Sequence, residues 1–133
     1  MSWCCLNGSL MPLDQAVISP MDRGFLFGDG VYEVMVRVDG QIRAKLLHEK
    51  RLAASLASIQ LDVSVEQIFV DVDRLIEKAN LASAKIYVQV TRGAATDRDH
   101  AFPVDVAPTV FLPIGEFKVT TYEACKAIVR PDI

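Results

Sequence analysis

The strongest constraint on the fold is a change in the spacing of apolar residues along the chain. Val31 to Val38 has the alternation of a strand, with Tyr32, Val34, Val36 and Val38 on one face. In the next apolar segment the spacing is helical, and one wide face gathers Val65, Ile68, Phe69, Val72, Leu75, Ile76 and Ala79. Ala84 to Arg92 is again rich in β-branched residues and tyrosine. A chain that passes from strand to helix and back predicts a sheet covered by helices.

Turn and cap residues separate these segments. Asn7-Gly8 between Trp3–Leu6 and Ser9–Leu13 predicts a hairpin, because both residues accept positive φ. Asp39-Gly40 predicts a second turn, with a partner strand over Gln41–Leu46.

Two helices are expected between the strands. The first runs from about His48 to Ile59, with Leu52, Leu56 and Ile59 on one stripe. Ser64 opens the second, and Gln67 three residues on completes a capping box.

After the Ala84–Arg92 strand, a long loop over Gly93–Pro108 is followed by a short strand, Thr109–Leu112, and Ala124–Val129 predicts one more. The order predicts an α+β fold: an antiparallel or mixed sheet with two helices packed on one face.

Composition limits the number of domains and the classes of partner. With 133 residues the chain forms one domain at most. Its hydrophobic content of 51% and mean hydropathy of +0.26 are high for a free-standing domain and predict a surface that meets another domain or subunit. A net charge of -3, without a long run of Lys or Arg, argues against nucleic acid as a partner.

Cysteine and histidine usage argues against structural bridges and metals. Cys4, Cys5 and Cys125 are odd in number and lack C-x-x-C spacing, and the only histidines are His48 and His100. Neither a disulfide framework nor a metal site is expected. The sequence has no apolar stretch of membrane-spanning length and no basic-then-apolar leader, so we expect no membrane association and a cytoplasmic, reducing location.

Arg51 is the first candidate for chemistry. It is expected about one turn into the first helix, where unpaired N–H groups and the helix dipole favour an anion, and its guanidinium could hold a phosphate with a bidentate fork. The alternative is a solvated helix face with a surface ion pair to Glu49 or Asp73.

Arg98 and His100 are the second candidate, because a long loop inside a compact domain is uncommon unless it has a function. Together they could grip a carboxylate with one fixed charge and one tunable donor. The alternative is local pairing with Asp97, Asp99 or Asp105.

Tyr32 is the third candidate. A lone phenol on an apolar face is more often a core tyrosine with one hydrogen bond than the wall of a pocket. Gly28-Asp29-Gly30 before it has neither phosphate-loop nor dinucleotide spacing and is interpreted as turn chemistry. Asp22 and Arg23 are candidates for a local pair, and spacing assigns no role to Glu33.

Taken in order, several stretches resemble the D-amino acid aminotransferases and their class IV relatives over nearly the whole chain. The similar stretches are the Asn-Gly hairpin, DRGFLFGDGVYEV (Asp22–Val34), H-x-x-R-L at His48, IYVQVTRG (Ile86–Gly93) and RDHAFP (Arg98–Pro103). The resemblance implies a two-domain enzyme dependent on pyridoxal 5'-phosphate. It would transfer the amino group of a D-amino acid to a 2-oxo acid.

The same resemblance implies roles for five residues. Arg51 would bind the cofactor phosphate, and Tyr32, Arg98 and His100 would trap the substrate carboxylate, with Val34 lining the pocket. In the family the arginine–histidine pair reaches across a two-fold dimer, so a homodimer is expected. This pair favours the D-amino acid branch. A branched-chain aminotransferase, an aminodeoxychorismate lyase and a non-catalytic truncated dimerising fragment are the alternatives.

The chain departs from the family pattern in two respects. The segment Ala94–Asp97 is one residue longer than usual before Arg98. The family's Schiff-base lysine lies in its second domain, and none of the lysines here matches it: Lys45, Lys50, Lys78, Lys85, Lys118 and Lys126. The resemblance therefore implies an N-terminal domain over residues 1–120, with a linker near 115–120. Residues 121–133 would be the first strand of a missing second domain.

Because the lysine is absent, the 133-residue chain is expected to be catalytically inactive by itself. Incubation with pyridoxal phosphate, D-alanine and 2-oxoglutarate should yield pyruvate no faster than free cofactor does. A coupled lactate dehydrogenase assay measures this, and turnover above the free-cofactor rate would refute the expectation.

Overall fold

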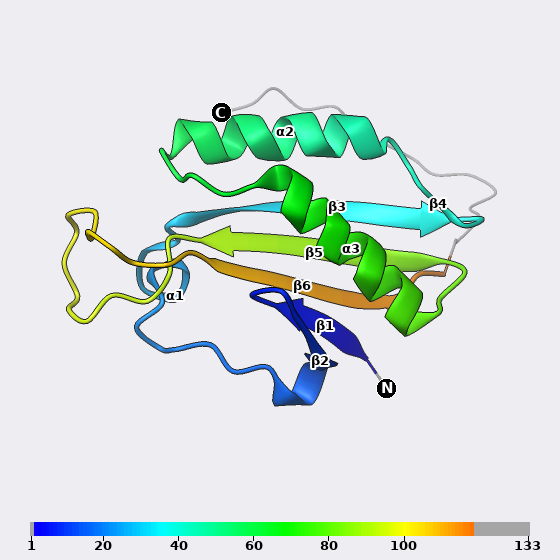
Figure 1. Ribbon diagram of the computed structural model, residues 1–133, viewed down its shortest axis with the longest axis horizontal. Helices are drawn as coiled ribbons and strands as arrows, with labels where there is room; N and C mark the ends of the chain where they lie inside the picture. The colour runs from blue at the N-terminus through cyan, green and yellow to red at the C-terminus, as the bar shows by residue number, and fades with distance from the viewer. Residues whose placement is uncertain (1, 119–133) are drawn as a thin grey trace, which may run out of the picture.

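The computed structural model describes residues 2–118, drawn in colour in Figure 1. In chain order the elements are β1 (Trp3–Leu6), β2 (Ser9–Pro12), a 3-10 turn (Leu13–Gln15), α1 (Arg23–Phe27), β3 (Gly30–Val38), β4 (Gln41–Ile42), α2 (Lys45–Ser58), α3 (Val65–Ala79), β5 (Ala84–Thr91) and β6 (Thr109–Glu116). The expected strand Ala124–Val129 and the last two residues of the expected linker, 119 and 120, lie outside the described residues. Gly115 and Glu116 of that linker belong to β6.

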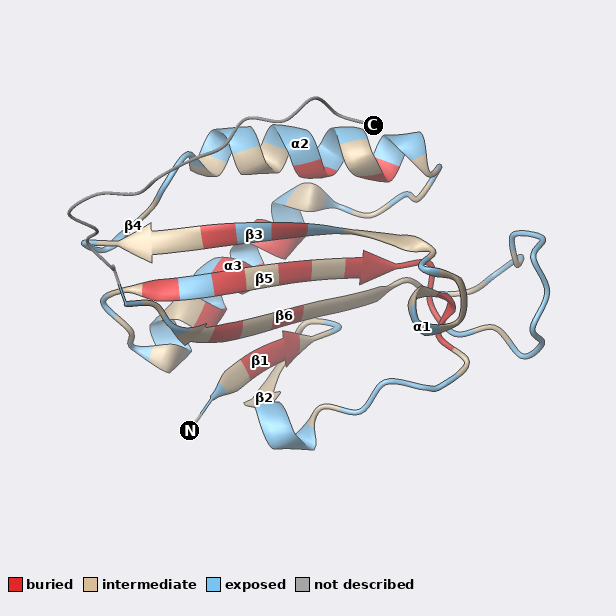
Figure 2. Ribbon diagram, turned by 180° about the vertical axis from the view of Figure 1, so that it is seen from behind, coloured by how far each residue is buried: buried red, intermediate tan, exposed pale blue. Residues whose placement is uncertain are grey.

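The six strands form one sheet in the order β2-β1-β6-β5-β3-β4, and every neighbouring pair is antiparallel. α2 and α3 cover one face of this sheet, and the opposite face carries no long helix within the described range (Figures 1 and 2). This confirms the α+β fold with two helices on one face.

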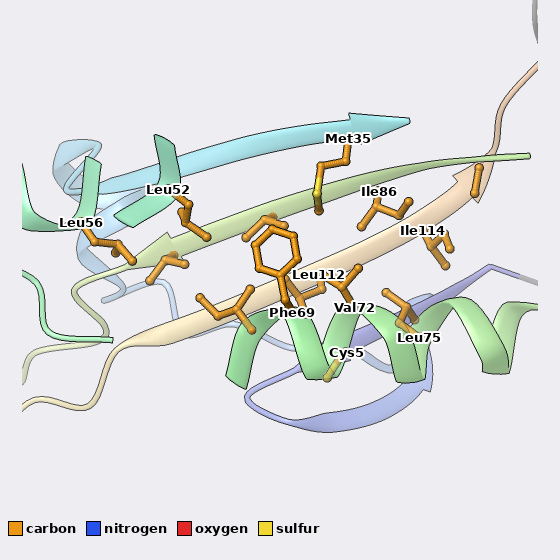
Figure 3. Packing of buried hydrophobic residues seen from close by; sticks show 14 residues of the cluster. Cys5, Met35, Leu52, Leu56, Phe69, Val72, Leu75, Ile86, Leu112 and Ile114 are labelled. Atoms are coloured by element: carbon orange, nitrogen blue, oxygen red, sulfur yellow. The ribbon is translucent and has the colours of Figure 1, made fainter. Parts of the chain in front are cut away.

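The apolar core lies between the sheet and these two helices (Figure 3). α3 contributes Ile68, Phe69, Val72 and Leu75, as its sequence pattern predicts, and α2 contributes Leu52 and Leu56. The strands meet them with Cys5, Met35, Ala84, Ile86, Val88, Val90, Leu112 and Ile114.

The predicted hairpin and the predicted helix cap are both present. Asn7 and Gly8 take φ values of 49° and 81° between β1 and β2, and Asn7 also bonds to Val110 at the start of β6 through its backbone and its amide oxygen. The Ser64 hydroxyl accepts from the Gln67 amide at 3.1 Å. The Gln67 side chain donates to Asp71 at 3.5 Å instead of returning to the cap, so half of the capping box forms.

The predicted boundaries around α2 are wrong. β4 ends at Ile42, and Ala44 takes a left-handed φ of 52° from which the helix begins at Lys45. Residues 43–46, expected to continue a strand, therefore form the turn and the first residues of α2. Arg51 consequently lies in the second turn of the helix, away from its unpaired N–H groups.

The face of β3 that the helices cover is not the face on which Tyr32, Val34, Val36 and Val38 alternate. The helices cover the face with Glu33 and Met35, whereas Tyr32 is 63% exposed and Val34 39% exposed on the other side. Alternation fixes which residues share a face, but the position of the helices decides which face is covered. Two further differences are α1, a helix that the sequence analysis did not anticipate, and β6, which extends four residues past Leu112.

Truncation of Leu75 tests the core. Its side chain is fully buried between α3 and the sheet, and alanine favours helix at least as well as leucine, so the loss comes from packing. Leu75→Ala should lower the free energy of unfolding by roughly 2–5 kcal/mol. The control Leu47→Ala, at a helical position that is 67% exposed, should change it by less than about 0.5 kcal/mol. Urea titration measures both, and equal losses would contradict the described core.

Candidate active site

Arg51 is held by a carboxylate from the neighbouring strand. Glu33 of β3 points toward α2, where it accepts from Arg51 Nε at 2.6 Å and Nη2 at 2.5 Å and from His48 Nδ1 at 2.7 Å. The Glu33 side chain is 2% exposed and the Arg51 side chain is 65% exposed. The buried acid thus orients a guanidinium whose other edge faces solvent.

This geometry corrects the expected alternative for Arg51. Its partner is Glu33 and neither Glu49 nor Asp73, since Asp73 pairs with Lys45 at 2.9 Å. Within residues 2–118, no protein group bonds to Nη1 of Arg51. Two N–H bonds therefore remain for an external acceptor.

The ion pair changes the acidity of both partners. The hydrogen bond from Arg51 lowers the pKa of Glu33, and although burial opposes this, the bond from His48 and the two positive charges add to it. The same bond and charge raise the pKa of Arg51. Glu33 is therefore a carboxylate at neutral pH, and it holds a charged fork in place.

Tyr32 and Val34 lie on the opposite face of β3 from Glu33. The Tyr32 ring stacks on Tyr87 of β5, with centroids 5.8 Å apart and an interplanar angle of 22°, and the Tyr87 hydroxyl donates to Gln89. Tyr32 is therefore not the core tyrosine that was the more frequent alternative. β3 separates its ring from Arg51, so the described chain does not bring these two candidates together.

Arg98 and His100 lie in the loop between β5 and β6, which extends past the sheet beside α1 (Figure 1). Both are exposed, and both contact the ring of Phe27: the Arg98 guanidinium carbon lies 4.8 Å from its centroid and the His100 ring 4.9 Å. Neither forms an ion pair with Asp97, Asp99 or Asp105 within the described range, so the local-pairing alternative is wrong for the chain as folded.

Beneath this loop lies a cluster that sequence reasoning missed. Asp29 accepts from Arg23 at 2.8 Å and from Arg92 at 2.9 Å, and both arginines are buried. The expected Asp22–Arg23 pair is replaced by this contact. Asp22 instead caps α1 through the Gly24 amide at 2.8 Å and accepts from Thr109 at 2.7 Å. No spacing in the sequence marks Arg92 as a partner of Arg23 and Asp29, because the pairing of β3 with β5 brings it to them.

An apolar pocket of about 480 Å³ opens on the face that carries Tyr32. Ile18, Pro20, Phe25, Thr91 and Phe111 are among its lining residues, and none of the five candidate residues lines it. Residues 2–118 contain no group of three side chains placed to hold a metal ion and no helix with the length and apolarity to cross a membrane.

The Glu33 contact predicts a dependence of stability on pH. The pKa of Glu33 in the folded chain is lower than its ordinary value of 4.5. The carboxylate therefore stabilises the fold at pH values above 4.5, and this stabilisation is lost as the pH falls through the lowered pKa. Glu33→Gln should cost roughly 1–3 kcal/mol of unfolding free energy at pH 6, and the difference from the unsubstituted chain should shrink toward pH 3. Urea titrations between these pH values measure it, and a difference that is constant with pH would exclude the ionised Glu33 contact.

The chain is similar to a known protein family. The family described as amino-transferase class IV matches residues 30–129. A D-alanine aminotransferase of Staphylococcus haemolyticus is 37% identical over 108 residues, which cover 79% of this chain and 38% of that protein. A D-alanine aminotransferase of Staphylococcus epidermidis is 34% identical over 134 residues, 96% of this chain and 47% of that protein. The chain thus spans less than half the length of these relatives.

Solved structures show the same fold. The 4-amino-4-deoxychorismate lyase of Pseudomonas aeruginosa is 26% identical with a TM-score of 0.68, and the match covers 82% of this chain and 38% of that one. The branched-chain amino acid aminotransferase of Escherichia coli is 19% identical with a TM-score of 0.79, covering 86% and 40%. With most of its residues matched by the family and its fold shared with these enzymes, the chain belongs to the class IV aminotransferases.

Proposed function

We propose that this chain forms the N-terminal part of a pyridoxal-phosphate-dependent enzyme that transfers the amino group of a D-amino acid to a 2-oxo acid. Membership of the class IV family supports amino transfer, and the D-alanine aminotransferases among its relatives support the D-amino acid. The expected cytoplasmic location remains a prediction.

The observation that carries the proposal is the fixed guanidinium of Arg51. Phosphate is recognised well by an arginine whose donors are pre-oriented, and Glu33 orients this one while leaving Nη1 at the surface. Arg51 could therefore make one contact to the cofactor phosphate, through Nη1. Pyridoxal phosphate, when bound, supplies an electron-withdrawing ring that stabilises negative charge on the substrate carbon.

The other candidates suit a substrate carboxylate. Arg98 supplies a permanent charge and His100 a second donor from the same exposed loop, while Tyr32 presents a phenol on the open face of the sheet. Val34 lies beside Tyr32 on that face and would form an apolar wall that excludes water. In this proposal, Arg98 and His100 serve the site of the partner in a homodimer.

Two alternatives stay open to test. A branched-chain aminotransferase or a lyase shares this fold. The first would differ in the amino acid used, and the second would not transfer an amino group to a 2-oxo acid. A non-catalytic dimerising fragment would differ from the enzyme in the length of its reading frame. A reading frame that continues into a lysine-bearing second domain supports the enzyme, and one that stops after Ile133 contradicts it.

Removal of Arg51 tests the phosphate contact in the protein translated from the complete reading frame. Arg51→Ala should weaken affinity for pyridoxal phosphate by roughly 1.5–3 kcal/mol, because a charge-assisted contact through Nη1 is lost. Lys50→Ala, which removes a neighbouring exposed charge, is the matched control and should leave affinity unchanged. Titration of apoenzyme followed by cofactor absorbance measures both, and equal affinities would return Arg51 to a purely structural role.

Mixing two inactive variants tests whether the loop serves the partner subunit. Arg51→Ala would damage a subunit's own site and Arg98→Ala its neighbour's, so each mixed dimer would keep one intact site. Random reassortment should recover roughly a quarter of wild-type activity, because half the dimers are mixed and half their sites whole. If both residues act within one subunit, verified exchange of subunits will restore no activity.

A further inference from the structure

The described chain contains one buried side chain that contacts the candidate loop at three successive residues. Arg23, 3% exposed, donates from Nη1 to the carbonyl of Asp99 at 2.6 Å and to that of Ala101 at 3.2 Å. Its Nη2 donates to the carbonyl of His100 at 3.2 Å. Its Nε donates to Asp29, so each nitrogen of the guanidinium has an acceptor.

From this geometry we infer that Arg23 is a positioning residue, which fixes the backbone of residues 99–101 so that Arg98 and His100 project from one predetermined place. The role of Arg98 and His100 in binding a carboxylate rests on the proposed function; the placement of the loop by Arg23 does not. Arg23 itself is buried and touches no substrate in this proposal.

The short helix α1 delivers both contacts to the loop. Arg23 and Phe27 are four residues apart and so share one face of the helix, and the Arg23 guanidinium carbon lies 4.8 Å from the Phe27 centroid. The same ring contacts Arg98 and His100. One arginine therefore holds the loop's backbone, and one ring holds its two functional side chains.

α1 is itself fixed against β5. Gly24 lies so close to the strand that a Cβ atom there would be 2.3 Å from Cγ2 of Thr91. The Arg23 amide donates to the carbonyl of Gly93 at 2.9 Å, and Asp22 forms an isolated antiparallel β-bridge with Ala94. α1 therefore contacts the last residue of β5 and the residues just after it, at the start of the loop.

Asp29 and Arg92 hold Arg23 in its orientation. Asp29, whose side chain is 11% exposed, binds both arginines with one oxygen, and Arg92 continues to the carbonyls of Ile59 at 2.7 Å and Gln60 at 3.5 Å. The Arg92 guanidinium carbon also lies 3.8 Å from the Phe102 centroid, next to the residues that Arg23 holds. A lysine at position 23 has one nitrogen and cannot reach Asp29 and all three carbonyls.

The chain's two histidines make the test direct. In a heteronuclear NMR spectrum of the 133-residue chain, the His100 ring should carry a ring-current shift from Phe27, and His48, bonded to Glu33, is an internal reference. In Arg23→Lys the His100 signals should move toward values for an exposed histidine while those of His48 stay. Exchange of the Asp99 and Ala101 amides should become about tenfold faster or more.

Arg37→Lys is the matched control. Arg37 also donates to loop carbonyls, those of Leu81 and Ala82, but at the opposite end of β3. This variant should lose a comparable contact and leave His100 unchanged, so a general loss of stability cannot reproduce the Arg23 result. His100 signals in Arg23→Lys that match those of Arg37→Lys would overturn the inference.

A second variant and a second measurement cover other outcomes. If Arg23→Lys does not fold, Asp29→Asn, which removes the charged acceptor that Arg23 shares with Arg92, should move His100 in the same direction. Unchanged His100 signals would refute the inference. In the protein from the complete reading frame, Arg23→Lys should raise KM for the amino acid roughly tenfold with a smaller change in kcat and an unchanged cofactor spectrum. An unchanged KM in that folded variant would also count against it.

Failure of the inference can be told apart from failure of the proposed function. If Arg98→Ala leaves KM unchanged while Arg23→Lys moves the His100 signals, the loop is positioned but does not bind the substrate. If Arg98→Ala raises KM and Arg23→Lys leaves His100 in place, the pair binds substrate without this anchor.

Discussion

The contact on which the rest of the site depends is the carboxylate of Asp29 between two buried arginines. Burial by itself would raise the pKa of Asp29, but the hydrogen bonds from Arg92 and Arg23 outweigh it and lower that pKa. Each buried guanidinium would be costly without this acceptor. Through it, α1, the start of β3, the end of β5 and the turn after α2 are joined at one end of the sheet.

A second constraint is that α2 and α3 cover one face of the sheet, whereas no long helix among residues 2–118 covers the other. Burial of Met35 on the covered face leaves Tyr32 and Val34 on the open one, and the same alternation turns Glu33 toward α2. Arg51 and Tyr32 therefore lie on different sides of β3. This arrangement agrees with a site completed by other protein surface, as the proposed dimer and second domain would supply.

Local pattern was sufficient to predict much of the fold. The apolar face of α3, the Asn7-Gly8 hairpin and the β5 strand follow from periodicity and turn chemistry that act over a few residues. The start of α2 was missed because Ala44 adopts a left-handed conformation that no residue preference announces. Glu33 was missed because it meets Arg51 only when α2 packs on the sheet, and the cluster of Arg23, Asp29 and Arg92 because Arg92 and the loop carbonyls are more than 60 residues away in sequence from their partners.

Arg51, Arg98 and His100 were singled out by residue type and position, but the groups that orient them were not.

The most direct test of amino transfer from a D-amino acid compares two amino donors in the protein translated from the complete reading frame. With pyridoxal phosphate and 2-oxoglutarate present, initial rates of glutamate formation are measured from D-alanine and from L-leucine. We expect rapid transfer of the amino group from D-alanine and little from L-leucine. Preference for L-leucine, or no transfer from either donor, would contradict it.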